Sequence, residues 1–197
     1  MIRVFDILFS IIVVIVLFPF LIIIAAVIKI TTAGDIFFIQ KRVGQSGKDF
    51  NLYKFRTMHK DADTKGLLTV GGRDSRITKV GYLLRKFKVD ELPQLINIIA
   101  GDMSIVGPRP EVRKYVEMYD DEQLKVLYVK PGLTDFASLE FINENELLAM
   151  SSNPEQLYIE KIMPAKLLLN KKFIDNRGIK IYFEVIIKTI KKIFFER

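Results

Sequence analysis

The chain of 197 residues contains no cysteine and only one histidine, His59. Without cysteine there is no disulfide framework, no thiol nucleophile and no Cys-ligated zinc site. A single histidine excludes a multi-histidine metal centre, and His59 stands in a polar stretch where nothing nearby would orient it for catalysis. The chemistry that remains for covalent or metal-dependent reactions is chiefly that of carboxylates, which favours a hard cation such as Mg²⁺.

Positive charge exceeds negative charge along the chain. Lysine and arginine number 30 against 23 aspartates and glutamates, which gives a formal net charge of +7. Such an excess suits an anionic partner, whether nucleic acid, acidic lipid or a phosphorylated substrate. We expect no nucleic acid partner, because no motif that combines basic and aromatic residues for recognition stands out. The length and the 50% hydrophobic content allow one catalytic domain with a substantial core.

The N-terminal region is a long apolar run, Phe5–Ile28, with Asp6 near its start and Lys29 just after its end. A membrane span needs about 20 such residues, so a single transmembrane helix is the direct interpretation. A cleavable signal peptide is not expected, because the run is longer than a typical h-region. In addition, no small-residue cleavage site precedes Lys29.

Pro19 in the middle of this run favours a different path. Proline removes a backbone hydrogen bond and kinks a helix. Arg3 and Lys29 place positive charge at both ends of the run, so charge gives no clear inside and outside. Both features are compatible with a helix that enters one leaflet, breaks at Pro19 and returns to the same face. Arg3 and Asp6 could pair on one helix face at i, i+3 spacing.

The rest of the chain predicts a mostly helical α+β fold with one small β-hairpin. Basic amphipathic helices in it could lie at the membrane interface, although each could also be an ordinary packed helix. The expected elements are strands at 36–40 and 50–55, a short strand at 105–106, and helices at 77–89, 111–129, 166–175 and 179–197.

Two adjacent carboxylates, Asp90 and Glu91, lie between a basic helical segment and an apolar one. Downstream, the prolines on either side of Arg109 restrict its backbone. A rigid arginine near paired acids suits a phosphate together with a divalent cation. The residues alone allow another interpretation, in which Asp90 caps a helix that starts at Glu91 and Glu91 favours the helix dipole.

Six short motifs occur in a characteristic order. This arrangement resembles the bacterial sugar transferases, also called monotopic phosphoglycosyl transferases, from about residue 3 to residue 136. The motifs are Gln-Lys-Arg-Val-Gly at 40–44, Lys-Phe-Arg-Thr-Met at 54–58, Asp-Glu-Leu-Pro-Gln-Leu at 90–95, Gly-Asp-Met-Ser at 101–104, Val-Gly-Pro-Arg-Pro at 106–110 and Lys-Pro-Gly-Leu-Thr at 130–134.

The resemblance implies transfer of a phosphosugar from a UDP-sugar to polyprenyl (undecaprenyl) phosphate, with release of UMP. This would be the first membrane step of glycan biosynthesis, for an O-antigen, capsule, exopolysaccharide or glycoprotein glycan. It implies that Asp90 is the nucleophile of a covalent aspartyl-phosphosugar intermediate and that Glu91 is a ligand of Mg²⁺. Arg56, Arg85 and Arg109 would contact substrate phosphates. A carboxylate nucleophile splits one transfer into two steps.

The resemblance also implies a location at the bacterial inner (cytoplasmic) membrane. Residues 1–30 would form a membrane-embedded re-entrant helix broken at Pro19. Residues 31–197 would form a catalytic domain that faces the cytoplasm and contacts membrane lipid.

The sequence departs from the family pattern at two places. The family usually has a Ser-Pro pair at the helix break, whereas Phe18 precedes Pro19 here. After the Pro-Gly-Leu-Thr motif the family typically has glycine and then an aromatic residue, whereas this chain has Asp135 and Phe136. The extra carboxylate could alter donor preference or could face solvent. Asp102 could form a turn or belong to the site.

Two rival functions follow from the same residues. A metal-dependent glycosyl transferase would move only the sugar and release UDP in place of UMP. A non-catalytic basic membrane adaptor would bind acidic lipid and would show no turnover. Its binding would be insensitive to Asp90→Asn.

Overall fold

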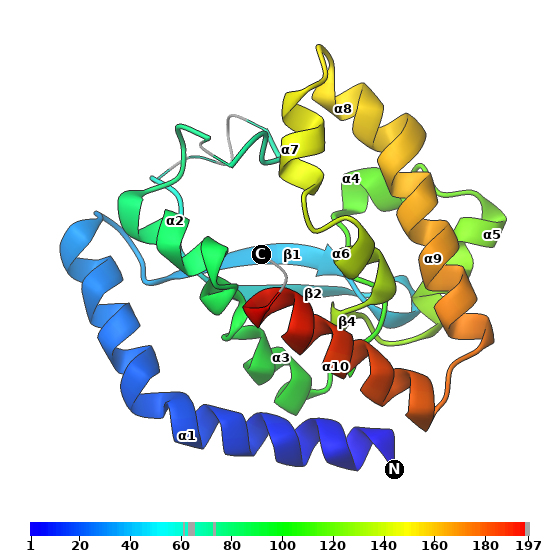
Figure 1. Cartoon of the computed structure of the whole chain (residues 1–197), viewed down its shortest axis with the longest axis horizontal. Coiled ribbons are helices and arrows are strands. Elements are labelled where there is room, and N and C mark those ends of the chain that lie inside the picture. The colour runs from blue at the N-terminus through cyan, green and yellow to red at the C-terminus, as the bar shows by residue number, and fades with distance from the viewer. Residues whose placement is uncertain (61, 63–65, 73, 196–197) are drawn as a thin grey trace.

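The computed structural model of the chain describes residues 1–60, 62, 66–72 and 74–195. It is mostly helical with two small sheets, which confirms the α+β class (Figure 1). In chain order the elements are α1 (Ile2–Thr31), β1 (Phe37–Val43), η1 (Gln45–Gly47), β2 (Asp49–Phe55), α2 (Lys79–Lys86), η3 (Val89–Glu91), α3 (Gln94–Ala100), β3 (Ser104–Val106), α4 (Arg113–Val116), α5 (Asp121–Leu124), η4 (Lys125–Tyr128), β4 (Gly132–Thr134), α6 (Phe136–Glu140), α7 (Glu144–Ala149), α8 (Pro154–Leu157), η5 (Tyr158–Ile162), α9 (Met163–Asp175) and α10 (Ile179–Phe194).

The predicted hairpin is confirmed as β1 and β2, which pair antiparallel from Phe37 opposite Phe55 to Val43 opposite Asp49. Each strand is longer than predicted, because the pairing continues right up to the turn. A buried asparagine on α3, Asn97, ties the hairpin to the helices. Its Oδ1 accepts the backbone N–H of Tyr53 at 3.1 Å, and its Nδ2 donates to a β2 carbonyl at 2.7 Å.

The segment that carries the acidic pair differs from the prediction. Helix α2 ends at Lys86, because Lys88 adopts a left-handed conformation (φ 57°) that turns the chain into the short η3. Asp90 and Glu91 lie inside η3, and α3 begins only at Gln94, with Pro93 at its N-cap. The interpretation of Asp90 as the cap of a helix that starts at Glu91 is therefore wrong.

The predicted single helix over 111–129 is also wrong. The chain forms three short helices there, α4, α5 and η4. The break has a local cause, since the Asp120 side chain accepts the backbone N–H of Gln123 and the Gln123 side chain accepts the backbone N–H of Asp120. This reciprocal capping box starts a new helix within the amphipathic pattern. The helix predicted over 179–197 is confirmed as α10 from Ile179 to Phe194, and the last two residues of the prediction, 196–197, lie outside the described residues.

A second, parallel sheet brings two of the motifs together. In it, Ser104 pairs with Gly132 and Val106 pairs with Thr134. The backbones approach closely just beyond β3, where a Cβ on Gly132 would lie 2.1 Å from the backbone nitrogen of Gly107. Both motifs therefore need glycine at this contact. The stretch that carries Arg109 is fixed beside the Lys-Pro-Gly-Leu-Thr motif.

Within the described part of the chain, the hydrophobic core has three parts. The central part joins β2, α3, β3, α9 and α10 through Leu52, Leu95, Ile98, Met103, Ile105, Val106, Phe173, Tyr182 and Val185. A second part lies under the helices of the C-terminal third, around Tyr115, Leu148 and Tyr158. The third part packs the end of α1 onto β2 and α2 through Ile24, Ile28, Phe55 and Leu84.

The first turns of α1 are anchored to the domain by buried polar groups. Asp6 is 1% exposed and accepts hydrogen bonds from Ser104 Oγ (2.9 Å), the Ile105 backbone N–H (3.0 Å) and Tyr182 OH (2.5 Å). Arg3 donates to two backbone carbonyls around the end of α3, both at 3.3 Å. The expected pairing of Arg3 with Asp6 is replaced by these contacts with the domain.

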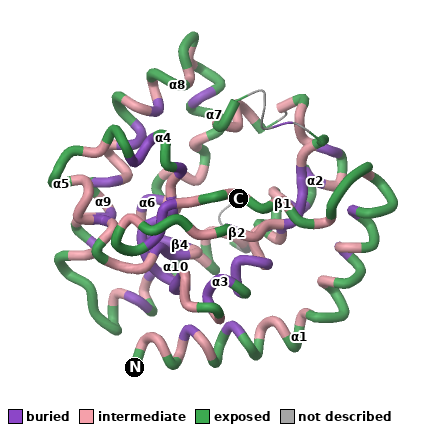
Figure 2. Tube along the Cα trace, turned by 180° about the vertical axis from the view of Figure 1, so that it is seen from behind, coloured by how far each residue is buried: buried purple, intermediate pink, exposed green. Residues whose placement is uncertain are grey.

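The other end of α1 rests on the same domain, since Ile28 is 1% exposed in the contact with β2 and α2. Between its ends, α1 is apolar in sequence and largely exposed, and Figure 2 shows how little of it is buried. Among the residues that the structure describes, α1 is the one helix long and apolar enough to cross a membrane. Its helical assignment continues through Pro19, and its ribbon changes direction along its length in Figure 1.

Candidate active site

The position of the acidic pair is set by a close contact between α2 and the chain after β2. Gly81 lies so near this chain that a Cβ on it would be 2.0 Å from the carbonyl oxygen of Thr57. Arg85 follows one turn later on the same face. The left-handed Lys88 then carries the chain into η3. Asp90 and Glu91 therefore follow a helix, α2, that packs directly against the backbone at Thr57.

Asp90 is a buried carboxylate with an open oxygen. It is 6% exposed, and its buried Oδ1 has no hydrogen-bond partner among the residues that the structure describes. Burial raises the pKa of Asp90, and the neighbouring negative charge of Glu91 raises it further. A buried polar atom without a partner costs free energy, so it needs an explanation. Binding of a substrate at this oxygen would be one such explanation.

Glu91 lies in the opposite environment. Arg109 binds both of its carboxylate oxygens, with Nη1 3.1 Å from Oε2 and Nη2 on Oε1, and Lys54 Nζ lies 3.3 Å from Oε1. Burial alone would raise the pKa of Glu91, but Arg109 and Lys54 outweigh it and hold that pKa well below its ordinary value. Glu91 is therefore a fixed negative charge with two cations beside it.

Lys54 is the member of the site that the sequence did not single out. Its side chain is 19% exposed, and this partial burial lowers the pKa of Lys54 to about 8, with Glu91 opposing the shift. Two signals in the sequence could have found it: its place in the 54–58 motif, and the alternation of β2 that turns it toward the helices. Arg109 shifts the other way, because Glu91 raises the pKa of its guanidinium.

The backbone of Arg109 is held by Asp135. The fully buried Asp135 accepts the Arg109 backbone N–H at 3.0 Å through Oδ2, and the Ser138 backbone N–H at 2.6 Å through Oδ1. It therefore caps α6 and fixes Arg109 with the same carboxylate. The expectation that Asp135 could face solvent is wrong. An effect of Asp135 on donor preference stays a prediction.

Arg85 lies close to the acidic pair but forms other contacts. Its Nε donates to Thr57 Oγ1 at 2.8 Å and its Nη1 donates to Thr69 Oγ1 at 3.2 Å. Burial lowers the pKa of Arg85, and the charge of Asp90 is the strongest influence that opposes this shift. Arg85 is thus a positive charge close enough to Asp90 to favour the ionised form of that carboxylate.

The structure places Arg56 elsewhere. Its guanidinium donates to the Ala33 carbonyl (2.7 Å) and to the carbonyl (3.0 Å) and hydroxyl (2.7 Å) oxygens of Thr32, just after α1. It therefore fastens the end of the apolar helix to β2. Its predicted contact with a substrate phosphate stays a prediction.

Glu111 forms a group of contacts just after Arg109 in the chain. Glu111 accepts hydrogen bonds from Arg42 Nη1 (3.1 Å) and Tyr158 OH, and Arg42 also donates to the carbonyl of Pro110 at 3.1 Å. These contacts brace the chain just after Arg109. Asp102 accepts a long hydrogen bond (3.4 Å) from Asn97, as a turn-forming residue would.

A divalent metal ion at the acidic pair would need additional oxygen ligands from the substrate. The described residues contain no group of three or more Asp, Glu, His or Cys side chains that could hold a metal ion. Mg²⁺, however, is usually bound by one or two carboxylates together with substrate phosphates and water. Glu91 Oε2, which accepts a hydrogen bond from Arg109 Nη1, and the unpartnered Oδ1 of Asp90 are the oxygen atoms that fit that mode of binding.

Comparisons with known proteins agree with the arrangement of motifs. The family model described as bacterial sugar transferase matches residues 1–196. A UDP-N-acetylgalactosamine-undecaprenyl-phosphate N-acetylgalactosaminephosphotransferase of Aeromonas hydrophila is 39% identical over 140 residues, 70% of this chain and 33% of that protein. The uncharacterized sugar transferase EpsL of Bacillus subtilis is 46% identical over 114 residues, 58% of this chain and 55% of that protein.

A UDP-glucose:undecaprenyl-phosphate glucose-1-phosphate transferase of Xanthomonas campestris is 39% identical over 128 residues, 62% of this chain and 26% of that protein. The chain thus spans between about a quarter and about half of the length of these three relatives. Since the family model covers nearly every residue, the resemblance read from the motifs is confirmed, and the chain belongs to the bacterial sugar transferase family.

Proposed function

We propose that this protein transfers a phosphosugar from a UDP-sugar to undecaprenyl phosphate and releases UMP, as the initiating step of exopolysaccharide or other glycan biosynthesis. The names of two relatives describe phosphosugar transfer to undecaprenyl phosphate, which supports this reaction over transfer of the sugar alone. Those two names differ in the sugar, so the proposal does not specify one.

The difference between the two carboxylates carries the proposal. Asp90 is buried with an open oxygen, whereas Glu91 is held by Arg109 and Lys54. In the first step, Asp90 attacks the phosphorus that bears the sugar, a phosphorus–oxygen bond breaks, and UMP departs with the bonding electrons. In the second step, an oxygen of undecaprenyl phosphate attacks the same phosphorus, and the aspartyl carboxylate leaves. Each step exchanges one phosphorus–oxygen bond for another.

The surrounding charges prepare the site for an anionic substrate. Arg85 and Arg109 would bind the diphosphate and so reduce the repulsion that Asp90 meets as it approaches. Glu91 would hold Mg²⁺ jointly with the substrate phosphates. The bound ion would supply neutralisation of charge on the leaving group.

An adaptor without catalysis is less consistent with the site. A surface that only attracts acidic lipid needs exposed cations. It gains nothing from a buried carboxylate whose desolvated oxygen is left without a partner. The product distinguishes the proposed reaction from that of a glycosyl transferase, because a glycosyl transferase would release UDP in place of UMP.

We also propose that α1 is re-entrant, with its break at Pro19, and that it holds the catalytic domain on the cytoplasmic face of the bacterial inner membrane. A straight helix of 30 residues would separate its ends by about 45 Å, more than the bilayer core of about 30 Å. Asp6 near one end and Ile28 near the other are both buried against the same domain. A bent helix satisfies both contacts from one side of the membrane.

The proposed reaction is tested by identifying the nucleotide product with a panel of UDP-sugars. The full chain in membranes should release UMP with at least one donor. Asp90→Asn should lower the rate by at least about a thousandfold, because the nucleophile is lost. Asp121→Asn, which changes an exposed acid outside the site, should keep the wild-type rate. Release of UDP, or turnover retained in Asp90→Asn, would contradict the proposal.

A further inference from the structure

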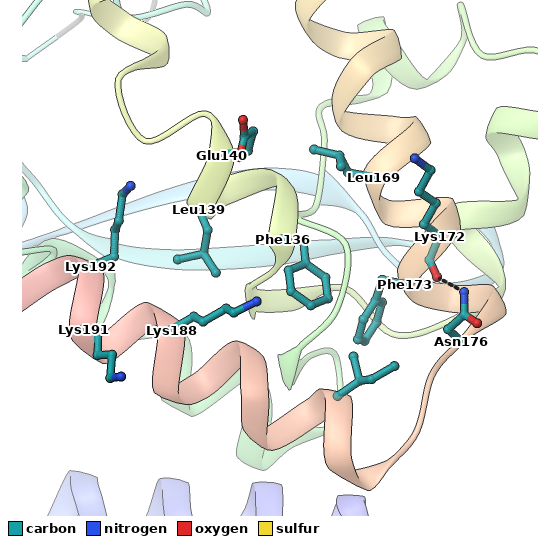
Figure 3. A pocket seen from close by; sticks show the side chains of 11 residues that line it. Phe136, Leu139, Glu140, Leu169, Lys172, Phe173, Asn176, Lys188, Lys191 and Lys192 are labelled. Carbon is teal, nitrogen blue, oxygen red and sulfur yellow. Dashed lines mark hydrogen bonds between the residues drawn. The ribbon is translucent and has the colours of Figure 1, made fainter. Parts of the chain in front are cut away.

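A groove of about 540 Å³ lies between α6, α9 and α10, and its described lining includes neither member of the acidic pair. Figure 3 shows aromatic and aliphatic side chains from α6 and α9 gathered at its centre. The floor is apolar and consists of Phe136, Leu139, Leu169, Phe173 and Ile181. An apolar floor of this kind favours a ligand with a hydrocarbon part.

The rim of the same groove is basic. Four lysines line it, Lys172 from α9 and Lys188, Lys191 and Lys192 from α10, against a single acid, Glu140. The side chain of Lys188 reaches across toward α6 in Figure 3, with its Nζ 5.4 Å from the centre of the Phe136 ring. Lys188 also forms an exposed ion pair with Glu184 at 2.7 Å. Such an exposed pair contributes little to stability, so a bound anion could replace it.

The outer surface of α10 adjoins the apolar helix. Four exposed side chains, Ile179, Phe183, Ile187 and Ile190, form a stripe along one face of α10 at helical spacing. The ring of Phe183 packs edge-on against that of Phe5 of α1, with 5.0 Å between centroids. The stripe is thus continuous with the exposed apolar surface of α1. Lysines beside an apolar stripe are typical of a helix in the headgroup region of a bilayer.

From these observations we propose that the groove binds the headgroup of an anionic phospholipid. The phosphoryl oxygens lie among the lysines, and the first carbons of the lipid chains cover the apolar floor. A bare phosphate ion would satisfy the lysines but would leave the apolar floor uncovered, so the lipid is the better occupant. This assignment needs the protein to lie on a membrane, but it does not depend on the transfer reaction.

The test measures lipid binding to the full chain in detergent by native mass spectrometry. Three compounds are compared: short-chain phosphatidylglycerol, phosphatidylcholine with the same chains, and glycerol phosphate. We expect one phosphatidylglycerol to bind at least about tenfold more tightly than phosphatidylcholine, since about 1 kcal/mol per nearby lysine favours the anionic headgroup. Glycerol phosphate should displace it poorly, because glycerol phosphate cannot cover the floor.

Matched variants locate the site. Lys172→Gln, Lys188→Gln and Lys192→Gln in one chain should weaken phosphatidylglycerol binding about tenfold or more. The same substitution at three exposed lysines outside the groove (Lys48, Lys79 and Lys161) should leave binding unchanged. Should the first triple variant fail to fold, Lys188→Gln alone is the second variant, with an expected loss of about fivefold.

Three results would overturn the proposal. Equal binding of the two lipids would remove the role of charge, and equal losses in both triple variants would reduce the effect to general attraction. Displacement by glycerol phosphate at the same concentration as the lipid would make this a site for soluble phosphate. None of these results depends on UMP release, so the failure of this proposal is distinguishable from failure of the proposed reaction.

Discussion

At the scale of single residues, two neighbouring carboxylates are given opposite environments. Glu91 is held between two cations, which favours its charged form, whereas burial disfavours the charge on Asp90. Opposite shifts in a pair of acids are a common sign of divided roles in a catalytic site. Because Arg109 and Lys54 form ion pairs with Glu91, the proposal assigns the nucleophilic role to Asp90.

The raised pKa of Asp90 has a consequence for stability. The folded protein binds a proton at Asp90 more readily than the unfolded chain does. Stability therefore falls as pH rises from the unfolded pKa, about 3.9, through the higher folded value. Asp90→Asn removes this cost, so we expect it to raise the thermal unfolding midpoint at neutral pH while it abolishes turnover. Unfolding followed by circular dichroism checks this, and an Asp90→Asn midpoint below that of the wild type would contradict it.

Lys54 predicts an alkaline limit to activity. Because burial lowers its pKa to about 8, Lys54 loses its charge as pH rises through that value, and the cation beside Glu91 is lost with it. We expect the rate of UMP release to fall above about pH 8 in the wild type. In Lys54→Arg the fall should move to higher pH, since arginine stays protonated. An identical alkaline limb in both proteins would show that another group sets it.

The residues of this site were only partly predictable from sequence. Asp90, Glu91, Arg85 and Arg109 stand in motifs, and the structure brings their charges close together. The second function of Asp135 was not predictable, because its bond to the Arg109 backbone joins residues 26 positions apart. Such a contact depends on the β3–β4 pairing, which no local pattern encodes.

At the scale of elements, the first turns of α1 are held by a buried acid. Asp6 accepts three hydrogen bonds from β3 and α10. Asp6→Leu would leave three buried donors unsatisfied, so we expect a loss of about 3 kcal/mol or more in unfolding free energy. Asp6→Asn keeps an acceptor and should lose less. Chemical unfolding in detergent measures both. A stability loss in Asp6→Leu no larger than in an exposed control, Asp121→Leu, would contradict this anchoring role.

The path of α1 can be tested because the chain has no cysteine of its own. Val4→Cys and Ile30→Cys place single thiols at exposed positions near the two ends of α1. A re-entrant helix predicts that a membrane-impermeant maleimide labels both from the side that labels Asp121→Cys on the domain. Labelling of the two ends from opposite sides would show a straight span. In the Pro19→Leu background, same-side labelling of Val4→Cys should decrease. Unchanged labelling there would count against Pro19 as the break.

Element boundaries show where sequence patterns are insufficient. The hairpin and α10 follow from alternation and helical periodicity, and both were predicted. The break of 111–129 arises from the Asp120–Gln123 capping box, and the early end of α2 arises from the left-handed Lys88. Both are local events of one or two residues that a periodicity spread over a whole segment does not detect.

At the scale of the whole molecule, the apolar helix and the reactive centre are parts of one packed unit. The end of α1 contacts β2 and α2, and the carbonyl groups after it bind Arg56, which stands in the same motif as Lys54. Lys54 in turn contacts Glu91. A short chain of contacts thus joins the apolar helix to the acidic pair. It suits the proposed reaction between a soluble nucleotide sugar and a lipid phosphate at the membrane surface.

The proposed covalent step is open to direct observation. The full chain is mixed with its UDP-sugar donor in the absence of undecaprenyl phosphate, quenched in acid and digested, and its peptides are weighed by mass spectrometry. The account predicts one added phosphosugar on the peptide that contains Asp90, in step with UMP release, and none in Asp90→Asn. A donor that is turned over to UDP while this peptide keeps its unmodified mass would contradict it.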